Sequence, residues 1–115
     1  GLGSAKYGTQ HFIVQRITAI ALVFLVVYVV GLVVCLVGAD YATARATVAH
    51  PCHAILLSAF LVAMFWHAQL GLQVVIEDYF HVRWQELSLQ ILVRFATLMA
   101  TLVALFAIGR IAFTG

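Results

Sequence analysis

The residues best suited to chemistry stand inside an apolar stretch of the chain. The run His67-Ala68-Gln69-Leu70-Gly71-Leu72-Gln73 carries a histidine and two glutamines between apolar neighbours, and the same stretch ends at Asp78 and Tyr79. Polar groups are expensive inside hydrocarbon, so residues of this kind usually have a function or a partner. The run is therefore the first place to look for a binding site.

His67 has two interpretations from its position alone. Imidazole nitrogen is a common axial ligand of haem iron, and Gly71 lies one helical turn onward on the same face. A residue without a side chain leaves room there for a flat macrocycle. The alternative is a histidine that forms a hydrogen bond with another helix, and the spacing leaves both interpretations open.

Three apolar segments must position these residues. The chain is 65% hydrophobic and 9% charged, and its mean hydropathy is +1.12, which excludes an ordinary soluble domain. A membrane-spanning helix needs about 20 apolar residues. We therefore predict an all-α integral membrane protein, a single domain over residues 1–115 with three transmembrane helices, at about 12–38, 53–78 and 87–113. Residues 1–11 are predicted to be a flexible or surface-lying lead-in, and residues 40–50 a short outer connection.

The basic residues predict an orientation. Four of them fall near one membrane face and two near the other, and basic residues favour the cytoplasmic side, so we expect the N-terminus there. The four are Lys6, Arg16, Arg83 and Arg94, and the two are Arg45 and Arg110. The net charge is only +2 and the chain contains no cluster of basic residues, which argues against nucleic-acid binding.

Arg16 is predicted to lie closer to the cytoplasm than His67. His67 precedes Ile76 by nine residues, or about 13 Å of helix, whereas Arg16 lies four residues beyond Phe12, or about 6 Å. A haem standing on edge, with its iron at His67, would bring its carboxylates toward Arg16, and guanidinium–carboxylate pairs are strong. An arginine that extends to lipid phosphate remains the alternative.

Two stretches together resemble a known family. His67-Ala68, Gly71, Gln73-Val74 and Asp78-Tyr79 in the second segment, and His11 to Arg16 at the start of the first, are similar to the small membrane-anchor subunit of succinate:quinone oxidoreductase (succinate dehydrogenase, respiratory complex II). The resemblance implies that His67 is an axial ligand of haem b, with Gly71 beside it. It also implies that Arg16 and, more weakly, His11 lie near the haem carboxylates.

For the end of the second segment, the resemblance implies a quinone site. Tyr79 would form a hydrogen bond with a quinone carbonyl, and Asp78 would orient or help to protonate that site. From the residues alone, Tyr79 fits an interfacial aromatic belt with Trp84 and Phe80 equally well. Asp78 would then be a solvated loop acid.

The resemblance also implies partners. The chain would not be catalytic alone. It would share haem b with a second cytochrome b anchor subunit and bind a flavoprotein and an iron–sulfur subunit, which carry FAD and the iron–sulfur clusters. Electrons would pass from succinate, an acid of the tricarboxylic acid cycle, to a quinone of the respiratory chain, in a bacterial inner membrane rather than a mitochondrial one. The alternative is a haem-free accessory subunit of another complex, or a small transporter.

The remaining histidines and cysteines carry weaker patterns. His50 and His53 flank Pro51 and Cys52, and two histidines three residues apart are weak support for a metal site. Cys35 and Cys52 form no metal motif. Two free apolar cysteines are the favoured interpretation of that pair.

Overall fold

Four helices account for nearly all of the chain. This computed structural model describes residues 2–114 and, for residues 2–7 and residue 11, the backbone alone. The helices are α1 (Leu2–Leu36), α2 (Tyr41–Ala49), α3 (Pro51–Tyr79) and α4 (Arg83–Phe113). No strand occurs within residues 2–114, so the prediction of an all-α fold is confirmed.

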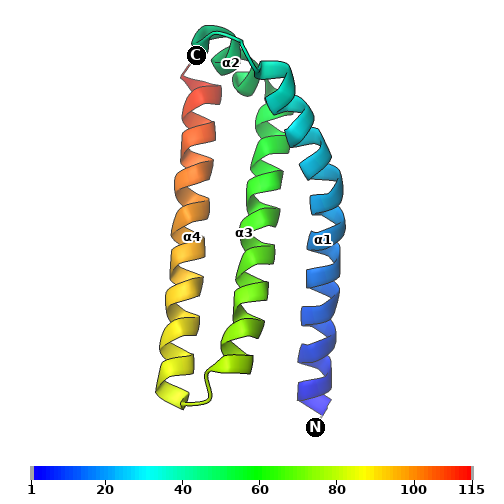
Figure 1. Ribbon diagram of the computed structural model, residues 1–115, viewed down its shortest axis with the longest axis vertical. Helices are drawn as coiled ribbons and strands as arrows, with labels where there is room; N and C mark the ends of the chain where they lie inside the picture. The colour runs from blue at the N-terminus through cyan, green and yellow to red at the C-terminus, as the bar shows by residue number, and fades with distance from the viewer. Residues whose placement is uncertain (1, 115) are drawn as a thin grey trace.

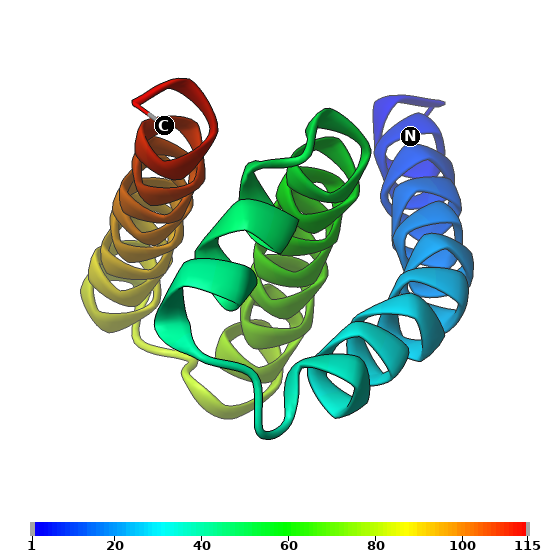
Figure 2. The ribbon, with the colours of Figure 1, turned by 90° about the horizontal axis from the view of Figure 1, so that it is seen from above.

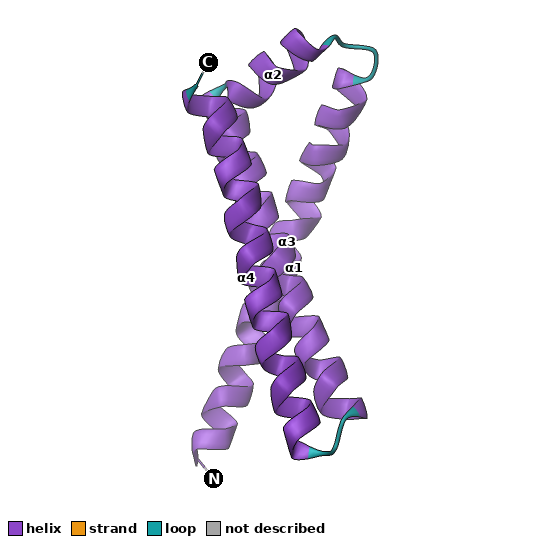
Figure 3. Cartoon of the chain, turned by 90° about the vertical axis from the view of Figure 1, so that its left-hand side faces the viewer, coloured by secondary structure: helices purple, strands orange, loops and turns teal. Residues whose placement is uncertain are grey.

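The three long helices stand in a row with α3 in the middle. α3 packs against both α1 and α4, and Figure 1 shows it between them. The N-terminus and the α3–α4 loop (residues 80–82) lie together at what we call the N-terminal end. The short helix α2 and the C-terminus lie at the opposite end, the α2 end, where α2 crosses over the tops of α3 and α4 (Figure 2). In Figure 3, α1 crosses the α3–α4 pair at an angle, whereas α3 and α4 run side by side.

All three long helices suit a membrane by length and composition. The spans are Gly8–Leu36, Pro51–Tyr79 and Arg83–Phe113, of 29, 29 and 31 residues. A helix of this length extends about 43 Å, which exceeds the roughly 30 Å hydrocarbon thickness of a bilayer. The prediction of three candidate transmembrane helices is confirmed, and each has a turn or more to spare for the interfaces.

Local sequence explains where these helices break. Gly38 adopts a φ of +83°, a left-handed conformation that glycine tolerates without steric cost. Asp40 then caps α2 by accepting the Thr43 amide at 2.9 Å, and the bonds to Thr43 lower the pKa of this carboxyl. His50 caps α3 by accepting the Cys52 amide at 3.2 Å, and Pro51 occupies the first helical turn, where its missing N–H costs nothing.

The observed boundaries correct several predicted ones. Residues 2–11 extend α1 instead of forming a flexible lead-in, since glycines weaken a helix by only about 1 kcal/mol each and no proline interrupts the segment. Residues 41–49 form α2 within the predicted connection, because the cap at Asp40 starts a helix. α4 begins at Arg83 rather than near residue 87, since polar residues can form the first turn of a helix as well as a loop.

The helices bury little of one another. Only four of the residues with described side chains are buried: Thr18, Ala54, Leu70 and Ile76. Large apolar side chains are exposed along all three long helices, among them Phe24, Ile55 and Phe106. Lipid chains are as apolar as these side chains, so helices in a membrane gain little by covering them. The few contacts that the helices do make are therefore informative.

Candidate functional site

His67 lies in the middle of α3 and contacts α1 through Thr18. The Thr18 hydroxyl lies 3.1 Å from His67 Nδ1. The same hydroxyl donates to the carbonyl of Gln15, one turn earlier in α1, at 3.0 Å. Thr18 is only 5% exposed, whereas His67 is half-buried. The second ring nitrogen, His67 Nε2, forms no hydrogen bond with the part of the chain that the structure describes.

Open space lies beside Gly71, one turn after His67 on the same face of α3. A Cβ placed on this glycine would meet no atom within 4 Å. Among the described residues, no atom of another helix lies within 4 Å of that position. The arrangement leaves room beside His67 for a flat ligand or for another chain.

Arg16 forms no hydrogen bond with His67. Its guanidinium carbon lies 4.9 Å from the centre of the Phe12 ring, and its side chain is exposed. Arg16 precedes Thr18 by two residues, which places it about 200° around α1 from the threonine. Thr18 faces α3, so Arg16 faces away from α3. The side chain of His11, the other predicted residue near the carboxylates, lies outside the described residues.

Asp78 and Tyr79 end α3 at the N-terminal end. Both are exposed, Tyr79 to 77%, and neither forms a hydrogen bond with any described residue. Asp78 lies eleven residues after His67, so it shares a stripe of the helix with His67 and Gly71, about 16 Å along the axis. Tyr79 lies about 120° around the helix from His67.

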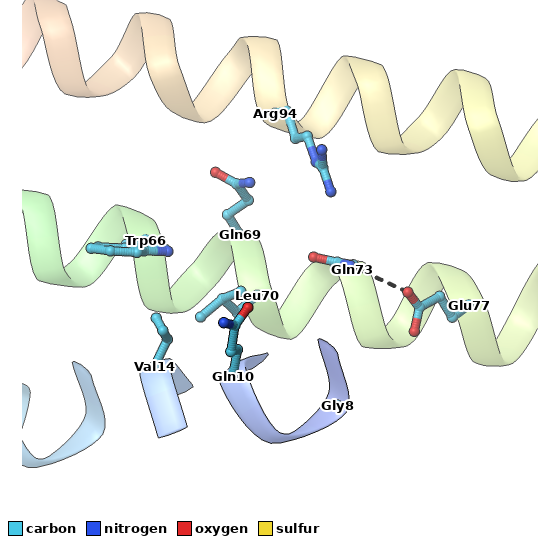
Figure 4. Close-up of a pocket in the computed structure, with 9 residues that line it drawn as sticks. All are labelled: Gly8, Gln10, Val14, Trp66, Gln69, Leu70, Gln73, Glu77 and Arg94. Atoms are coloured by element: carbon cyan, nitrogen blue, oxygen red, sulfur yellow. Dashed lines mark hydrogen bonds between the residues drawn. The ribbon is translucent and has the colours of Figure 1, made fainter. Parts of the chain in front are cut away.

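A polar cavity of about 510 Å³ lies beside this region. It is lined by Gly8, Gln10, Val14, Trp66, Gln69, Leu70, Gln73, Glu77 and Arg94. Figure 4 shows the Arg94 side chain directed from α4 toward α3, close to Gln69 and Gln73. Gln73 donates to Glu77 at 3.3 Å. Asp78 and Tyr79 do not line this cavity.

A second pair of hydrogen-bonded side chains joins α1 and α3 nearer the α2 end. The Tyr28 hydroxyl lies 2.5 Å from His53 Nδ1, and the two rings stack with their centres 5.8 Å apart. His50 meets His53 edge to face at 5.7 Å. Among the described side chains, no group of three or more His, Cys, Asp or Glu residues could hold a metal ion, so these histidines serve as a cap and as an interhelical bond.

The two cysteines are free and exposed. Cys35 lies near the end of α1 and Cys52 near the start of α3. The structure thus agrees with the sequence interpretation of two unpaired thiols.

Sequence reasoning missed Thr18, the residue that contacts His67. A weak pattern was available, because Thr18 is the one polar residue between Arg16 and Tyr28. The polar cavity was also missed, since its lining comes from three helices whose mutual rotation the sequence does not give.

Comparison with known proteins gives a consistent result. A family model described as succinate dehydrogenase/fumarate reductase transmembrane subunit matches residues 1–108. The succinate dehydrogenase hydrophobic membrane anchor subunit of Rickettsia bellii is 34% identical over 110 residues, which cover 93% of this chain and 88% of the relative. The corresponding subunit of Paracoccus denitrificans is 28% identical over 111 residues, covering 95% and 86%. No solved structure gives a significant match to this chain. With three membrane-length helices and this match over most of its length, the chain belongs to the family of succinate dehydrogenase membrane-anchor subunits.

Proposed function

We propose that this chain anchors the catalytic subunits of a succinate dehydrogenase in the membrane and supplies His67 as an axial ligand of haem b. Asp78 and Tyr79 contribute to the site where quinone is reduced. The observation that carries the proposal is the state of His67, an imidazole held through Nδ1 by Thr18 with its Nε2 unpaired among the described residues. A haem ligand in a membrane needs this combination of a fixed ring and a free nitrogen.

The residues around His67 fit a haem. Nε2 offers the nitrogen ligand, and Gly71 leaves open space one turn away. When bound, haem stores and releases one electron at a time. The cofactor would be shared with a second anchor subunit, which would supply the other ligand. This chain therefore needs to supply only one ligand of the haem iron, His67.

Arg16, together with His11, would pair with the haem carboxylates. Arg16 now lies over the Phe12 ring, and an exposed cation–π contact is worth about 0.5–1 kcal/mol. A hydrogen bond to a charged group contributes about 1.5–3 kcal/mol. A carboxylate near α1 would thus draw the guanidinium away from the ring, at small cost to the helix.

Tyr79 and Asp78 suit a quinone site because both are exposed at the N-terminal end. A phenol at the membrane interface can donate to a quinone carbonyl while its ring stays in apolar surroundings. A carboxyl group beside it can orient the phenol or deliver a proton as the quinone is reduced.

The partners follow from the same assignment. Residues 1–115 form one anchor domain that binds the second cytochrome b subunit within the membrane. The iron–sulfur and flavoprotein subunits, which hold the clusters and FAD, dock at the N-terminal end. The N-terminus would then lie in the cytoplasm. The bacterial relatives support a bacterial inner membrane as the location. The basic residues Arg83 and Arg94, nearer that end, support this orientation.

A second candidate function is a haem-free accessory subunit. The hydrogen bond between Thr18 and His67 favours it, since a bond across two helices is itself a reason for a histidine within a membrane. In that case Nε2 would bind no iron.

Replacement of His67 separates the two functions. The purified complex of the His67→Ala chain should lose haem or bind it in a five-coordinate or otherwise altered form. His53→Ala is the matched control, because His53 also lies on α3 and also bonds to α1, through Tyr28. It should leave the haem absorption bands unchanged. Unaltered low-spin bands in the His67→Ala complex would refute the haem assignment and leave only the loss of a hydrogen bond, worth about 1–2 kcal/mol.

A further inference from the structure

Thr18 is the one buried polar residue among the side chains that the structure describes, and its hydroxyl bonds to His67. We infer that Thr18 is a positioning residue that holds His67 as the tautomer with the proton on Nδ1 and the lone pair on Nε2. The inference rests on the proposed ligation of haem by His67. It adds that α1, through Thr18, sets the orientation of the His67 ring and how strongly its nitrogen would donate electrons to the iron.

The direction of the hydrogen bonds follows from counting protons. The Thr18 hydroxyl has one proton and can accept through its lone pairs. The Gln15 carbonyl, 3.0 Å away, can only accept, so a bond between the two uses the hydroxyl proton. His67 Nδ1 at 3.1 Å must then donate its own proton to Thr18. The lone pair of the imidazole is left on Nε2, which is the atom that can bind iron.

The other interhelical histidine lacks this constraint. His53 Nδ1 meets the Tyr28 hydroxyl at 2.5 Å, but among the described residues the phenol proton has no second acceptor. It is therefore free to go to Nδ1, which would leave a proton on Nε2 of His53. The two histidines of α3 therefore differ. The hydroxyl proton of Thr18 is already used in a bond to Gln15, whereas that of Tyr28 is not, so only His67 is held with its lone pair on Nε2, the form that can bind a metal.

Burial strengthens the effect of the bond. A threonine that bonds back to the preceding turn keeps its hydroxyl fixed relative to α1, and water cannot replace a partner that is only 5% exposed. Groups that accept from a ligating histidine fix its ring and raise its basicity, and their loss typically lowers metal affinity about 10- to 100-fold. Greater basicity stabilises ferric over ferrous iron, so loss of the bond should make the haem potential more positive.

The test compares Thr18→Ala with Thr18→Ser in the purified complex. Both variants lose the methyl group, and they differ in the hydroxyl alone. In Thr18→Ala we expect a lower ratio of haem to flavin, altered electron paramagnetic resonance of the ferric haem, and a more positive midpoint potential. A tenfold change in the ratio of ferric to ferrous affinity corresponds to about 59 mV. Thr18→Ser should keep the wild-type values of all three.

Matched variants distinguish the outcomes. Thr97→Ala removes a hydroxyl from the α3–α4 contact and should leave the haem unchanged. If Thr18→Ala prevents assembly, Thr18→Val keeps the volume and takes its place. Equal values in the Ala and Ser variants, whether altered or wild-type, would refute a role for the hydroxyl. If His67→Ala removes the ligand while Thr18→Ala changes nothing, this inference fails and the proposed function stands. If His67→Ala leaves the haem unchanged, both fail.

Discussion

Tyr79→Phe isolates one hydroxyl at the proposed quinone site. Tyr79 is 77% exposed and its hydroxyl has no partner among the described residues, so the change removes no contact that holds this chain together. The ring remains and the helix is unaltered. Any loss of activity would therefore report a bond to something outside the chain.

The size of the loss follows from the hydrogen bond. A polar group of a ligand left without its partner costs about 1–3 kcal/mol. At about 1.36 kcal/mol for each factor of ten in rate, quinone reduction should fall roughly 5- to 150-fold. Oxidation of succinate by a soluble dye does not use this site and should keep its wild-type rate.

Tyr41→Phe is the matched control. Tyr41 is 80% exposed and begins α2, so the same hydroxyl is removed at the opposite end of the molecule. Quinone and dye reduction are measured with membranes that contain each variant. Equal quinone kinetics in the Tyr79 and Tyr41 variants would return Tyr79 to an interfacial aromatic role and refute the reasoning.

Three further predictions concern topology and stability. In a chain without its native cysteines, an impermeant thiol reagent applied to sealed cells should label Arg45→Cys and spare Arg83→Cys; the reverse would invert the proposed orientation. Thr97→Val removes a hydroxyl that lies 3.0 Å from the Gln69 side-chain amide, and should lower the stability of the complex by about 0.6 kcal/mol, measured by thermal dissociation; a loss well above 1.7 kcal/mol would contradict the usual strength of such bonds. The lowered pKa of Asp40 means that its charged form stabilises α2 above the ordinary carboxyl pKa, and that this contribution is lost as the pH falls through the lowered value; the protection of the Thr43 amide against hydrogen exchange, taken relative to the intrinsic rate at each pH, should then fall, and in Asp40→Asn this protection should not change with pH.

Hydropathy was sufficient to predict the three long helices, because a run of 20 or more apolar residues has few alternatives to a spanning helix. It could not locate the ends. Residues 2–11 are polar and glycine-rich, yet they continue α1, and α2 depends on one cap at Asp40. The start of α2 depends on a single hydrogen bond, and residues 2–11 are helical because no proline interrupts them; hydropathy reports neither.

The sequence predicts only some residues of the candidate site. His67, Asp78 and Tyr79 were distinguished by their polarity and spacing, since a histidine in an apolar helix is conspicuous in any sequence. Its partner Thr18 was not, because a threonine in a helix usually bonds to its own backbone. Only the rotation of α1 against α3 brings the Thr18 hydroxyl to His67, and that rotation depends on contacts spread over both helices.

The small buried interior has a consequence for the life of the protein in the cell. A chain with four buried side chains among those described has little free energy of its own to resist local opening. Copies that have not met their partners would expose Arg94 and the polar cavity to lipid, and membrane proteases could remove them readily. The abundance of the subunit should then follow the supply of its partners and of the cofactor, with excess synthesis corrected by turnover rather than by a folded reserve.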